Sequence, residues 1–473
     1  MTRTILLSLL FALCSLPLVG CPSGSLSLPG DDDDTSGDDD TSGDDDTTAI
    51  EPPSVTALDW RLHAEFGALV HVSWEQSAEA AVHVEYSFDE GEWHNAPTLQ
   101  ATAGANEQLV VGIPYAMDAA WRVVVEQGDV FEGETITTGE IPDELPQATL
   151  ETAEPDAWLP SGNYLLTSIN RDNGGWAAGR YWTFIVDRKG RPVWARAAPG
   201  DDWTLFAQIS VSGDHILWDQ ATYWSDMDDG AGSSVHRAYL DVEIEEIATP
   251  GLHHAFVELP DGTLVWGSQD HGGGEALVEK GPDDPSESVL WTCNDDWPGS
   301  GGQWGCESNG LFYVEATDTF LYSFYTNSSV VEVDRITGES LWWAGTVNGG
   351  YDFVPSNMQF SWQHGISYTE SGTLLLSTEA GGAGYGTVLR EYTVDHDAET
   401  LEMVWNFGAG IHAETNGDAW RLDNGNTLHV VGSASEIYEV DSADAIVWHL
   451  DFHGTRLLGR GQFIEDLYTL VSP

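Results

Sequence analysis

Hydrophobic and polar residues alternate along short segments of this chain, and residues that favour turns separate the segments. The runs at 69–74, 82–86 and 121–125 are typical of strands that bury one face. Long stretches with helical periodicity are missing, and the chain contains 51 glycines and 20 prolines. The pattern therefore predicts an all-β protein in which short strands are joined by tight turns.

Beyond residue 158 the strand pattern repeats. The segments 254–266, 364–376 and 417–429 carry a glycine at the same offset, followed by a second strand, a third strand and a fourth strand that contains tryptophan. Four strands in a repeat of about 40 to 50 residues are typical of a β-propeller blade. With a divergent unit over 205–247, we predict six blades over 158–473, closed by a strand within 463–468.

The segment before the propeller divides into a small β-domain and a linker. Residues 52–142 carry short alternating strands at the spacing of a β-sandwich. This part resembles a fibronectin type III domain, an immunoglobulin-like fold, with Trp74 as its core tryptophan. Residues 143–157 are acidic and contain proline, which predicts a linker.

The first residues predict an export signal. Residues 1–20 combine Arg3 with an apolar stretch that is too short to span a bilayer, which is typical of a signal peptide. The sequence Leu-Val-Gly-Cys that ends at Cys21 resembles the lipoprotein box of bacteria. The resemblance implies lipidation of Cys21 and anchoring in the cell envelope, and Pro22 after it favours the outer membrane. A chance cysteine behind an ordinary signal is the alternative.

The charge of the chain limits its partners. Lys and Arg total 16 and Asp and Glu total 78, giving a formal net charge of −62. Such a chain repels nucleic acids and has no basic patch for an anionic membrane, so a lipid would be its contact with the membrane. Residues 21–51 contain repeated aspartates, which predict an extended tether; a calcium-binding segment is the alternative. We expect no required cofactor, with a structural Ca²⁺ left open.

The chain has four cysteines. Cys14 belongs to the predicted signal and Cys21 to the predicted anchor, which leaves Cys293 and Cys306. In an oxidising compartment these two are expected to form a disulfide that closes a loop rich in glycine and tryptophan. A metal site with two cysteines is the alternative, although no pair of histidines lies nearby in the sequence.

The first strand of each propeller blade lines the central channel, so equivalent residues of different repeats meet near one mouth. This brings His254, residues 307–309 and His364 together. Two imidazoles with a carboxylate or an amide can perform nucleophilic or acid/base catalysis, or hold a metal. A hydrogen-bonded histidine that links neighbouring blades is the alternative for His364. His253 would point away from His254 if the strand is regular.

Several segments of the propeller resemble the bacterial aryl-sulfate sulfotransferases, which are six-bladed propellers. The segments are 331–339 with Leu341-Trp342, 360–364, 388–392 and 421–428. The resemblance implies that the histidine matched by His364 attacks the sulfur of an aryl sulfate. A phenol then takes the sulfuryl group from the resulting sulfohistidine, and no nucleotide sulfate donor is needed. His254 matches the channel histidine of the family.

The sequence also departs from the family pattern. Asn309 matches a family asparagine, but Glu307 stands where the family has histidine, Tyr325 falls near a family arginine, and Gly365 replaces an aspartate. These changes remove a cation and add a carboxylate where an anionic substrate would bind.

Two hypotheses about function follow. In the first, His364 is the nucleophile of a sulfotransferase, His254 and Asn309 bind the sulfuryl group, and Tyr325 and Glu307 serve acid/base roles. In the second, the anchored propeller binds an aromatic, glycan or protein ligand without catalysis.

Overall fold

The computed structural model of the chain describes residues 53–89, 91–126, 128–174, 179–200, 202–222, 230–269, 275–297, 305–381 and 386–473. The predicted signal peptide (1–20) and the predicted anchor and tether (21–51, with Cys21) lie outside the described residues. The fold is all-β, as predicted. Helix is confined to α2 (Cys293–Asp296) and the 3-10 helices η1 (Ser356–Met358), η2 (Gly432–Ala434) and η3 (Leu467–Leu470) in these ranges. None of them is long and apolar enough to cross a membrane.

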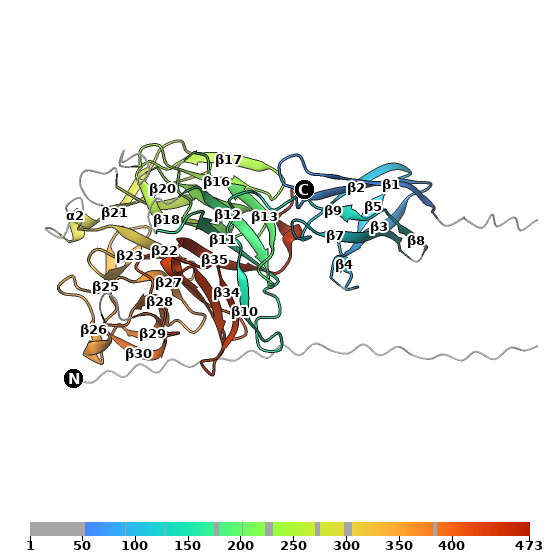
Figure 1. Cartoon of the computed structure of the whole chain (residues 1–473). Helices are drawn as coiled ribbons and strands as arrows, with labels where there is room; N and C mark the ends of the chain where they lie inside the picture. Colours follow the sequence, from blue (N-terminus) through green and yellow to red (C-terminus); the bar gives the residue numbers. More distant parts are fainter. Residues whose placement is uncertain are drawn as a thin grey trace, which may run out of the picture. The chain divides into compact units, whose positions relative to one another are not determined.

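Two antiparallel sheets form the N-terminal part of the described chain (Figure 1). One sheet has the order β1-β2-β6: β1 (Val55–Leu62), β2 (Val70–Gln76) and β6 (Gly104–Val110). The other has the order β4-β3-β7-β8, with β5 beside β3 and β9 beside β7: β3 (Ala80–Ser87), β4 (His94–Asn95), β5 (Leu99–Ala101), β7 (Asp118–Val125), β8 (Val130–Glu132) and β9 (Ile136–Thr137). Both sheets contribute to one apolar core, in which Trp74 is 1% exposed. The alternating strands therefore form a sandwich.

Six sheets, each built on four antiparallel strands and two of them with a fifth strand added, form the rest of the described chain, and we number them as blades. Blade 1 contains β35 (Leu458–Ile464), β11 (Tyr164–Asn170), β12 (Tyr181–Asp187) and β13 (Pro192–Ala197). Blade 2 contains β14 (Ala207–Ile209), β15 (Ile216–Gln220), β16 (Ser234–Ala238) and β17 (Glu243–Ala248). Blade 3 contains β18 (Leu252–Glu258), β19 (Leu264–Ser268), β20 (Ala276–Lys280) and β21 (Ser288–Thr292).

The remaining blades follow the same order from the innermost strand outward. Blade 4 contains β22 (Ser308–Val314), β23 (Thr319–Phe324), β24 (Ser329–Asp334) and β25 (Ser340–Gly345). Blade 5 contains β27 (His364–Tyr368), β28 (Leu374–Glu379), β29 (Thr387–Asp395) and β30 (Thr400–Phe407), with β26 (Asp352–Val354) parallel to β30. Blade 6 contains β31 (Asp418–Arg421), β32 (Thr427–Val431), β33 (Glu436–Val440) and β34 (Ile446–Asp451).

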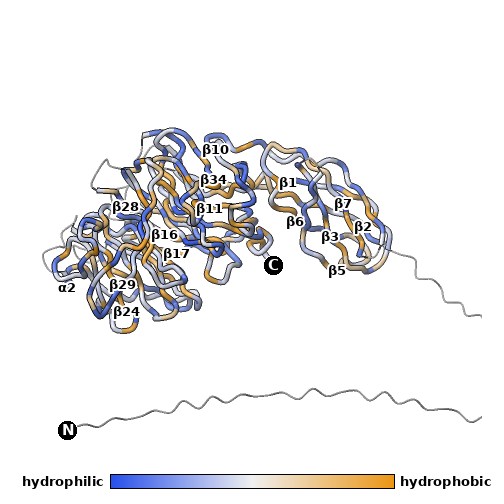
Figure 2. The backbone as a smooth tube through the Cα atoms, turned by 90° about the horizontal axis from the view of Figure 1, so that it is seen from below, coloured by the Kyte–Doolittle hydropathy of each residue, from blue (hydrophilic) through white to orange (hydrophobic). Residues whose placement is uncertain are grey.

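Apolar clusters join each blade to the next and close the ring. Blades 1 to 6 share clusters in sequence, and one further cluster joins blade 6 back to blade 1. Neighbouring blades cover the second strands on both faces, so all six residues of both β23 and β28 are buried. Figure 2 shows hydrophobic segments within both groups of strands. The six-bladed propeller predicted from the repeats is confirmed.

The repeated glycines form the turns between first and second strands. Gly262, Gly372 and Gly425 have φ of +82°, +78° and +86°. The amide of each donates to the carbonyl three residues earlier. A side chain at Gly372 or Gly425 would meet no atom within 4 Å, so the requirement for glycine at these turns is conformational. The predicted tryptophans lie on the fourth strands, counted outward from the channel, of five blades, at Trp194, Trp291, Trp342, Trp405 and Trp448.

Two segments differ from their predicted boundaries. The closing strand β35 begins at Leu458 and ends at Ile464, pairing with β11, so it starts before the predicted segment 463–468. Within the predicted linker 143–157, residues Thr149–Ala153 form strand β10, which pairs with β34 at the outer edge of blade 6. Leu150 packs against the core of that blade while its neighbours face solvent. Pairing to a distant strand, which local composition does not reveal, explains this correction.

Arg188 joins blade 1 to blade 6 where the ring closes. Its Nη1 donates to Oε2 of the fully buried Glu439 at 2.8 Å, and its guanidinium also donates to the carbonyl oxygens of Leu159 and Gly162. The guanidinium carbon lies 3.9 Å from the ring centre of Phe463. Arg188 is only 9% exposed, so this ion pair is desolvated and depends on both partners.

The structure joins Cys293 and Cys306 in the predicted disulfide. Cys293 begins helix α2, and Cys306 precedes the first strand of blade 4. Both cysteines are buried in the apolar cluster between blades 3 and 4. The disulfide therefore connects the end of one blade to the start of the next.

Candidate functional site

The starts of the inner strands bring the predicted site residues together. His254 lies on β18, His364 is the first residue of β27, and Tyr325 follows β23. The ring centre of Tyr325 lies 6.2 Å from that of His364 in a stacked arrangement. It also lies 6.3 Å from the ring centre of His254, edge to face. Tyr325 therefore lies between two imidazoles that are more than 100 residues apart in sequence.

The turn before β27 fixes the orientation of the His364 ring. Nδ1 of His364 lies 3.1 Å from the carbonyl oxygen of Trp362. A carbonyl oxygen only accepts, so Nδ1 carries the proton and the neutral ring has its lone pair on Nε2. Trp362 has φ of +51°, a left-handed conformation that is rare for a bulky residue and turns its carbonyl toward the imidazole. The backbone thus selects the tautomer in which Nε2 carries the lone pair.

Burial also keeps His364 uncharged. Desolvation lowers the pKa of His364 to about 4, and the hydrogen bond to Trp362 opposes this shift only in part. At neutral pH the imidazole is therefore neutral. A neutral imidazole of fixed tautomer has the properties required of a nitrogen nucleophile.

We expect this pKa to appear in the pH dependence of any reaction that uses the neutral His364 ring. Since the pKa is lowered, the ring stays neutral as pH falls from 6.5 to about 4, and kcat/KM should keep its acid limb near pH 4. The measurement is kcat/KM between pH 3.5 and 8, with circular dichroism at each pH to exclude unfolding. An acid limb near 6.5, the ordinary value for histidine, would contradict the assignment.

The neighbouring residue His253 forms a hydrogen bond with His254. Nδ1 of His253 lies 3.0 Å from Nδ1 of His254, so one of the two rings donates to the other. When His253 donates, His254 carries its own proton on Nε2 and has an uncharged N–H donor there. Burial lowers the pKa of both histidines, to about 3 for His253. Pairing between β18 and β19 is irregular from Leu252 to Phe256, so the expected separation of the two rings does not occur.

Glu275 is a buried carboxyl group that sequence analysis missed. Its Oε2 lies 3.8 Å from Nε2 of His253. Its Oε1 accepts hydrogen bonds from Ser308 Oγ and Tyr322 OH, both at 2.5 Å. Burial raises the pKa of Glu275 to about 7, against the effect of these hydrogen bonds. Glu275 precedes the third strand of blade 3, and no repeated spacing in the sequence marks it.

Tyr325 and Glu307 occupy the positions where the family resemblance placed cations. The Tyr325 hydroxyl donates to Oε2 of Glu307, which is buried at the start of blade 4. This pair brings a hydroxyl and a carboxyl group beside the two imidazoles. The arrangement suits proton transfer better than the binding of a multiply charged anion, because a carboxylate repels anions while a bonded hydroxyl and carboxyl can exchange a proton.

Both polar atoms of the Asn309 side chain form hydrogen bonds within the protein. Its Nδ2 donates to the carbonyl of Gln363 at 2.5 Å, and its Oδ1 accepts from Ser323 Oγ at 2.9 Å. Gln363 is fully buried, and its amide donates to Ser323 Oγ and to the carbonyls of Phe324 and Ser329 in blade 4. Asn309 and Gln363 therefore fix the backbone next to His364. This geometry favours a positioning role for Asn309 over the expected contact with substrate.

The close approach of two strands explains Gly365. Its φ is +53°, and a Cβ at this position would lie 2.4 Å from Cα and 2.6 Å from Oδ1 of Asp418 in blade 6. No side chain fits there. The close approach of β31 at Asp418 therefore requires glycine at position 365.

No group of three or more His, Cys, Asp or Glu residues in the described ranges is arranged to hold a metal ion. The site therefore consists of two neutral imidazoles, a tyrosine and a carboxyl group. Such a set provides a nucleophile, a hydrogen-bond donor and a proton carrier.

Comparison with known protein families matches part of the propeller to one family. The Arylsulfotransferase (ASST) family matches residues 313–453. This range runs from blade 4 to blade 6 and includes Tyr325 and His364, so the predicted resemblance to the aryl-sulfate sulfotransferases is confirmed over it. No curated protein matches the sequence.

Solved structures match the chain at low identity and low TM-score. A Bacteroides caccae protein of unknown function is 14% identical, with a TM-score of 0.42, and the match covers 63% of this chain and 97% of that one. TolB from Acinetobacter baumannii is 9% identical, with a TM-score of 0.40 and coverage of 73% and 79%. The Cps50 (Swd1) β-propeller domain of Myceliophteria thermophila is 13% identical, with a TM-score of 0.35 and coverage of 67% and 86%.

Proposed function

We propose that this protein transfers a sulfuryl group from an aryl sulfate to a phenolic acceptor through a sulfohistidine at His364. The observation that carries the proposal is the hydrogen bond from Nδ1 of His364 to the carbonyl of Trp362, which leaves the lone pair on Nε2. The family match that includes His364 supports the same reaction class. The donor is the aryl sulfate itself, so no nucleotide cofactor takes part.

In the first half-reaction the Nε2 lone pair forms an N–S bond while the bond between sulfur and the aryl oxygen breaks. The electron pair of the broken bond passes to the aryl oxygen, which takes a proton from the Tyr325 hydroxyl. Tyr325 is reprotonated by Glu307, with which it shares a hydrogen bond and which enters the cycle as a neutral carboxylic acid because it is buried. His254 donates to a sulfuryl oxygen from its neutral ring. This pathway allows the phenol to leave without a cation beside it.

In the second half-reaction the acceptor phenol reverses these steps. Its oxygen attacks sulfur, the N–S electron pair returns to Nε2 of His364, and the phenol proton passes through Tyr325 to Glu307. The protein ends in its starting protonation state. The kinetics should therefore be ping-pong, with the first phenol released before the acceptor binds.

Binding without turnover is the second candidate function. The rings of Tyr325, Trp362 and His364 lie together, and Trp362 is 45% exposed. Glu307 adds a carboxyl group where an anionic sulfuryl group would need neutralisation. These features suit an uncharged aromatic or sugar ligand, which the channel would hold against the exposed tryptophan.

A chromogenic aryl sulfate distinguishes the two candidates. With purified protein we expect release of the chromophore that depends on an added phenol, and a mass increase of one SO₃ group on the peptide that contains His364. The matched control omits the phenol and should show at most one turnover per molecule. Binding of the aryl compound without release or adduct would instead establish the noncatalytic propeller.

We further propose that the reaction takes place in the cell envelope, with Cys21 as the lipid anchor. The disulfide between Cys293 and Cys306 supports an oxidising compartment. The net charge of −62 supports a lipid, and not a basic patch, as the attachment to the membrane.

A further inference from the structure

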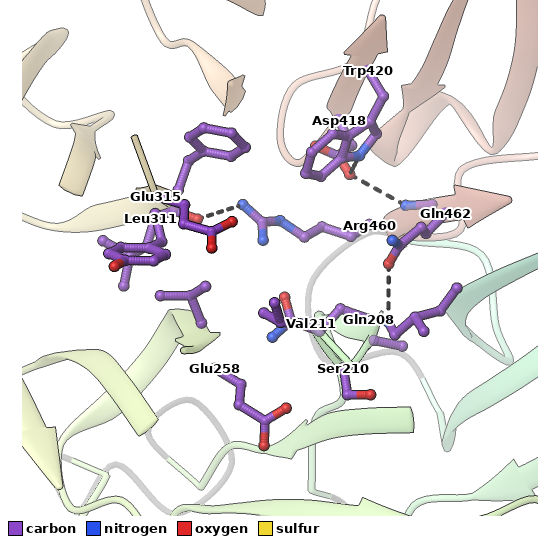
Figure 3. A pocket seen from close by; sticks show the side chains of 16 residues that line it. Gln208, Ser210, Val211, Glu258, Leu311, Glu315, Asp418, Trp420, Arg460 and Gln462 are labelled. Atoms are coloured by element: carbon purple, nitrogen blue, oxygen red, sulfur yellow. Dashed lines mark hydrogen bonds between the residues drawn. The ribbon is translucent and has the colours of Figure 1, made fainter. Parts of the chain in front are cut away.

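A cavity lies in the central channel, and neither His254 nor His364 lines it. It has a volume of about 310 Å³ and is lined by five of the six inner strands (Figure 3). Its lining includes Glu258, at the end of the strand that carries His254 near its start. At the rise of a β-strand the two residues lie roughly 13 Å apart along that strand. None of the residues that form the histidine site lines this cavity.

Arg460 extends across the cavity from the closing strand β35 (Figure 3). It is 4% exposed. Its Nη2 donates to the carbonyl of Leu311 at 3.1 Å, and its Nε has no partner among the described residues. A guanidinium has five N–H donors, and a buried donor without a partner is costly. Nε itself has almost no accessible surface, but the side chain as a whole lines the cavity, so its terminal N–H donors are placed to bind an acceptor there.

The carboxyl groups near Arg460 have other bonding partners. Asp418 and Asp219 are its buried acidic neighbours, and burial raises the pKa of both, to about 8 for Asp219. Asp418 accepts hydrogen bonds from Trp420 Nε1 and from the amide of Gly461. Glu258 is paired with Arg237, whose Nε lies 2.7 Å from Oε1. Within the described residues no hydrogen bond or ion pair joins these carboxyl groups to Arg460, so its charge is available to a ligand in the cavity.

The walls indicate the shape of the ligand. Trp420 and Phe312 lie 6.1 Å apart between ring centres, and both line the cavity with Tyr313. A volume near 310 Å³ is at the small end of ligand pockets and suits a single aromatic ring. A guanidinium pairs best with a planar oxyanion, which a carboxylate provides. Glu315, at the rim, disfavours ligands of higher negative charge.

We propose that this cavity binds a small aromatic monocarboxylate, with the carboxylate on Arg460 and the ring among Trp420, Phe312 and Tyr313. The site is separate from the histidine site and does not rest on the proposed sulfuryl transfer. The strongly acidic surface of the protein repels anions elsewhere, so specific binding should be measurable against a low background.

Isothermal titration of the full chain with benzoate tests the proposal. We expect saturable binding of benzoate, and binding of benzyl alcohol, which has the same ring without the charge, to be at least about tenfold weaker. Inorganic sulfate should also bind more weakly than benzoate, because it lacks the ring. Absence of saturable benzoate binding, or equal affinity for benzyl alcohol, would overturn the proposal.

Variants locate the site. Gln208 lines the cavity and is partly exposed, so Gln208→Glu adds a negative charge with little effect on folding. We expect it to weaken benzoate binding at least about tenfold. Gln100→Glu, on the exposed side of β5 in the sandwich, is the matched control and should bind normally. Arg460→Met should abolish binding where circular dichroism shows a native fold. Unchanged affinity in Gln208→Glu would refute the location.

A third variant separates the two sites. His364→Ala removes the proposed nucleophile and should leave benzoate affinity unchanged. Loss of benzoate binding in this variant would contradict a separate cavity, whatever the outcome of the aryl-sulfate assay.

Discussion

His364→Ala should reduce aryl-sulfate turnover by at least about 10³-fold while the protein remains folded. The substitution removes Nε2, the atom that forms the N–S bond, and leaves Tyr325, Glu307 and His254 in place. The side chain of His364 is only half-buried, and its one hydrogen bond is to the backbone of Trp362. We therefore expect a small change in Tm, measured by the loss of tryptophan fluorescence, beside the large loss in kcat.

Two further measurements separate loss of the nucleophile from general damage. Free imidazole added to His364→Ala should restore part of the turnover, because it enters the space that the side chain leaves and supplies the same nitrogen. His449→Ala is the matched control. His449 is a half-buried histidine on the outer strand β34, bonded to Glu436 at 3.0 Å, and its removal should leave turnover unchanged. Persistent turnover in His364→Ala would move the nucleophile to another residue, with His254 the next to test.

Arg188→Met should lower the free energy of unfolding by about 3 to 5 kcal/mol, the range for a buried ion pair that loses one partner. The substitution leaves Glu439 charged and fully buried, with its Oε2 deprived of the hydrogen bond from Nη1. It also removes the cation that packs on Phe463 of the closing strand. Urea denaturation followed by tryptophan fluorescence measures the effect.

The matched control is Arg196→Met. Arg196 is paired with Glu243, but both side chains are about one-third exposed, so water screens the pair and we expect a loss of about 1 kcal/mol or less. In Arg188→Met/Glu439→Gln the buried carboxylate is also removed, and part of the lost stability should return. If Arg188→Met alone lowers the free energy of unfolding by less than about 1 kcal/mol, the ion pair between Arg188 and Glu439 does not stabilise the closed ring.

The propeller could be predicted because its signals are local and repeated. A turn glycine such as Gly372 and an outer-strand tryptophan such as Trp342 recur at regular intervals, and each reports on a few neighbouring residues. Strand β10 and the start of β35 were harder to predict, because both are defined by pairing with strands far away in the sequence. Local composition at residues 149–153, acidic with isolated apolar positions, does not distinguish an edge strand from a linker.

The sequence repeats also predicted the candidate site, but only those of its residues that hold repeated positions. His254 and His364 hold equivalent positions near the starts of inner strands, so the repeat alone places them together. Glu275 reaches the site from the start of a third strand, where no repeated position marks it. The contact between His253 and His254 results from irregular pairing of β18, which alternation cannot foresee.

The pairing of β35 with β11 also determines the order in which parts of the molecule can fold. Leu165 on β11 pairs with Phe463 on β35, so blade 1 takes its innermost strand from almost 300 residues farther along the chain. Contacts this distant form late, because a long loop must first close. Arg460 lies on the same strand, so the cavity around it is complete only after the ring has closed. A partly synthesised chain with five finished blades would therefore contain both histidines of the candidate site and still have an open channel.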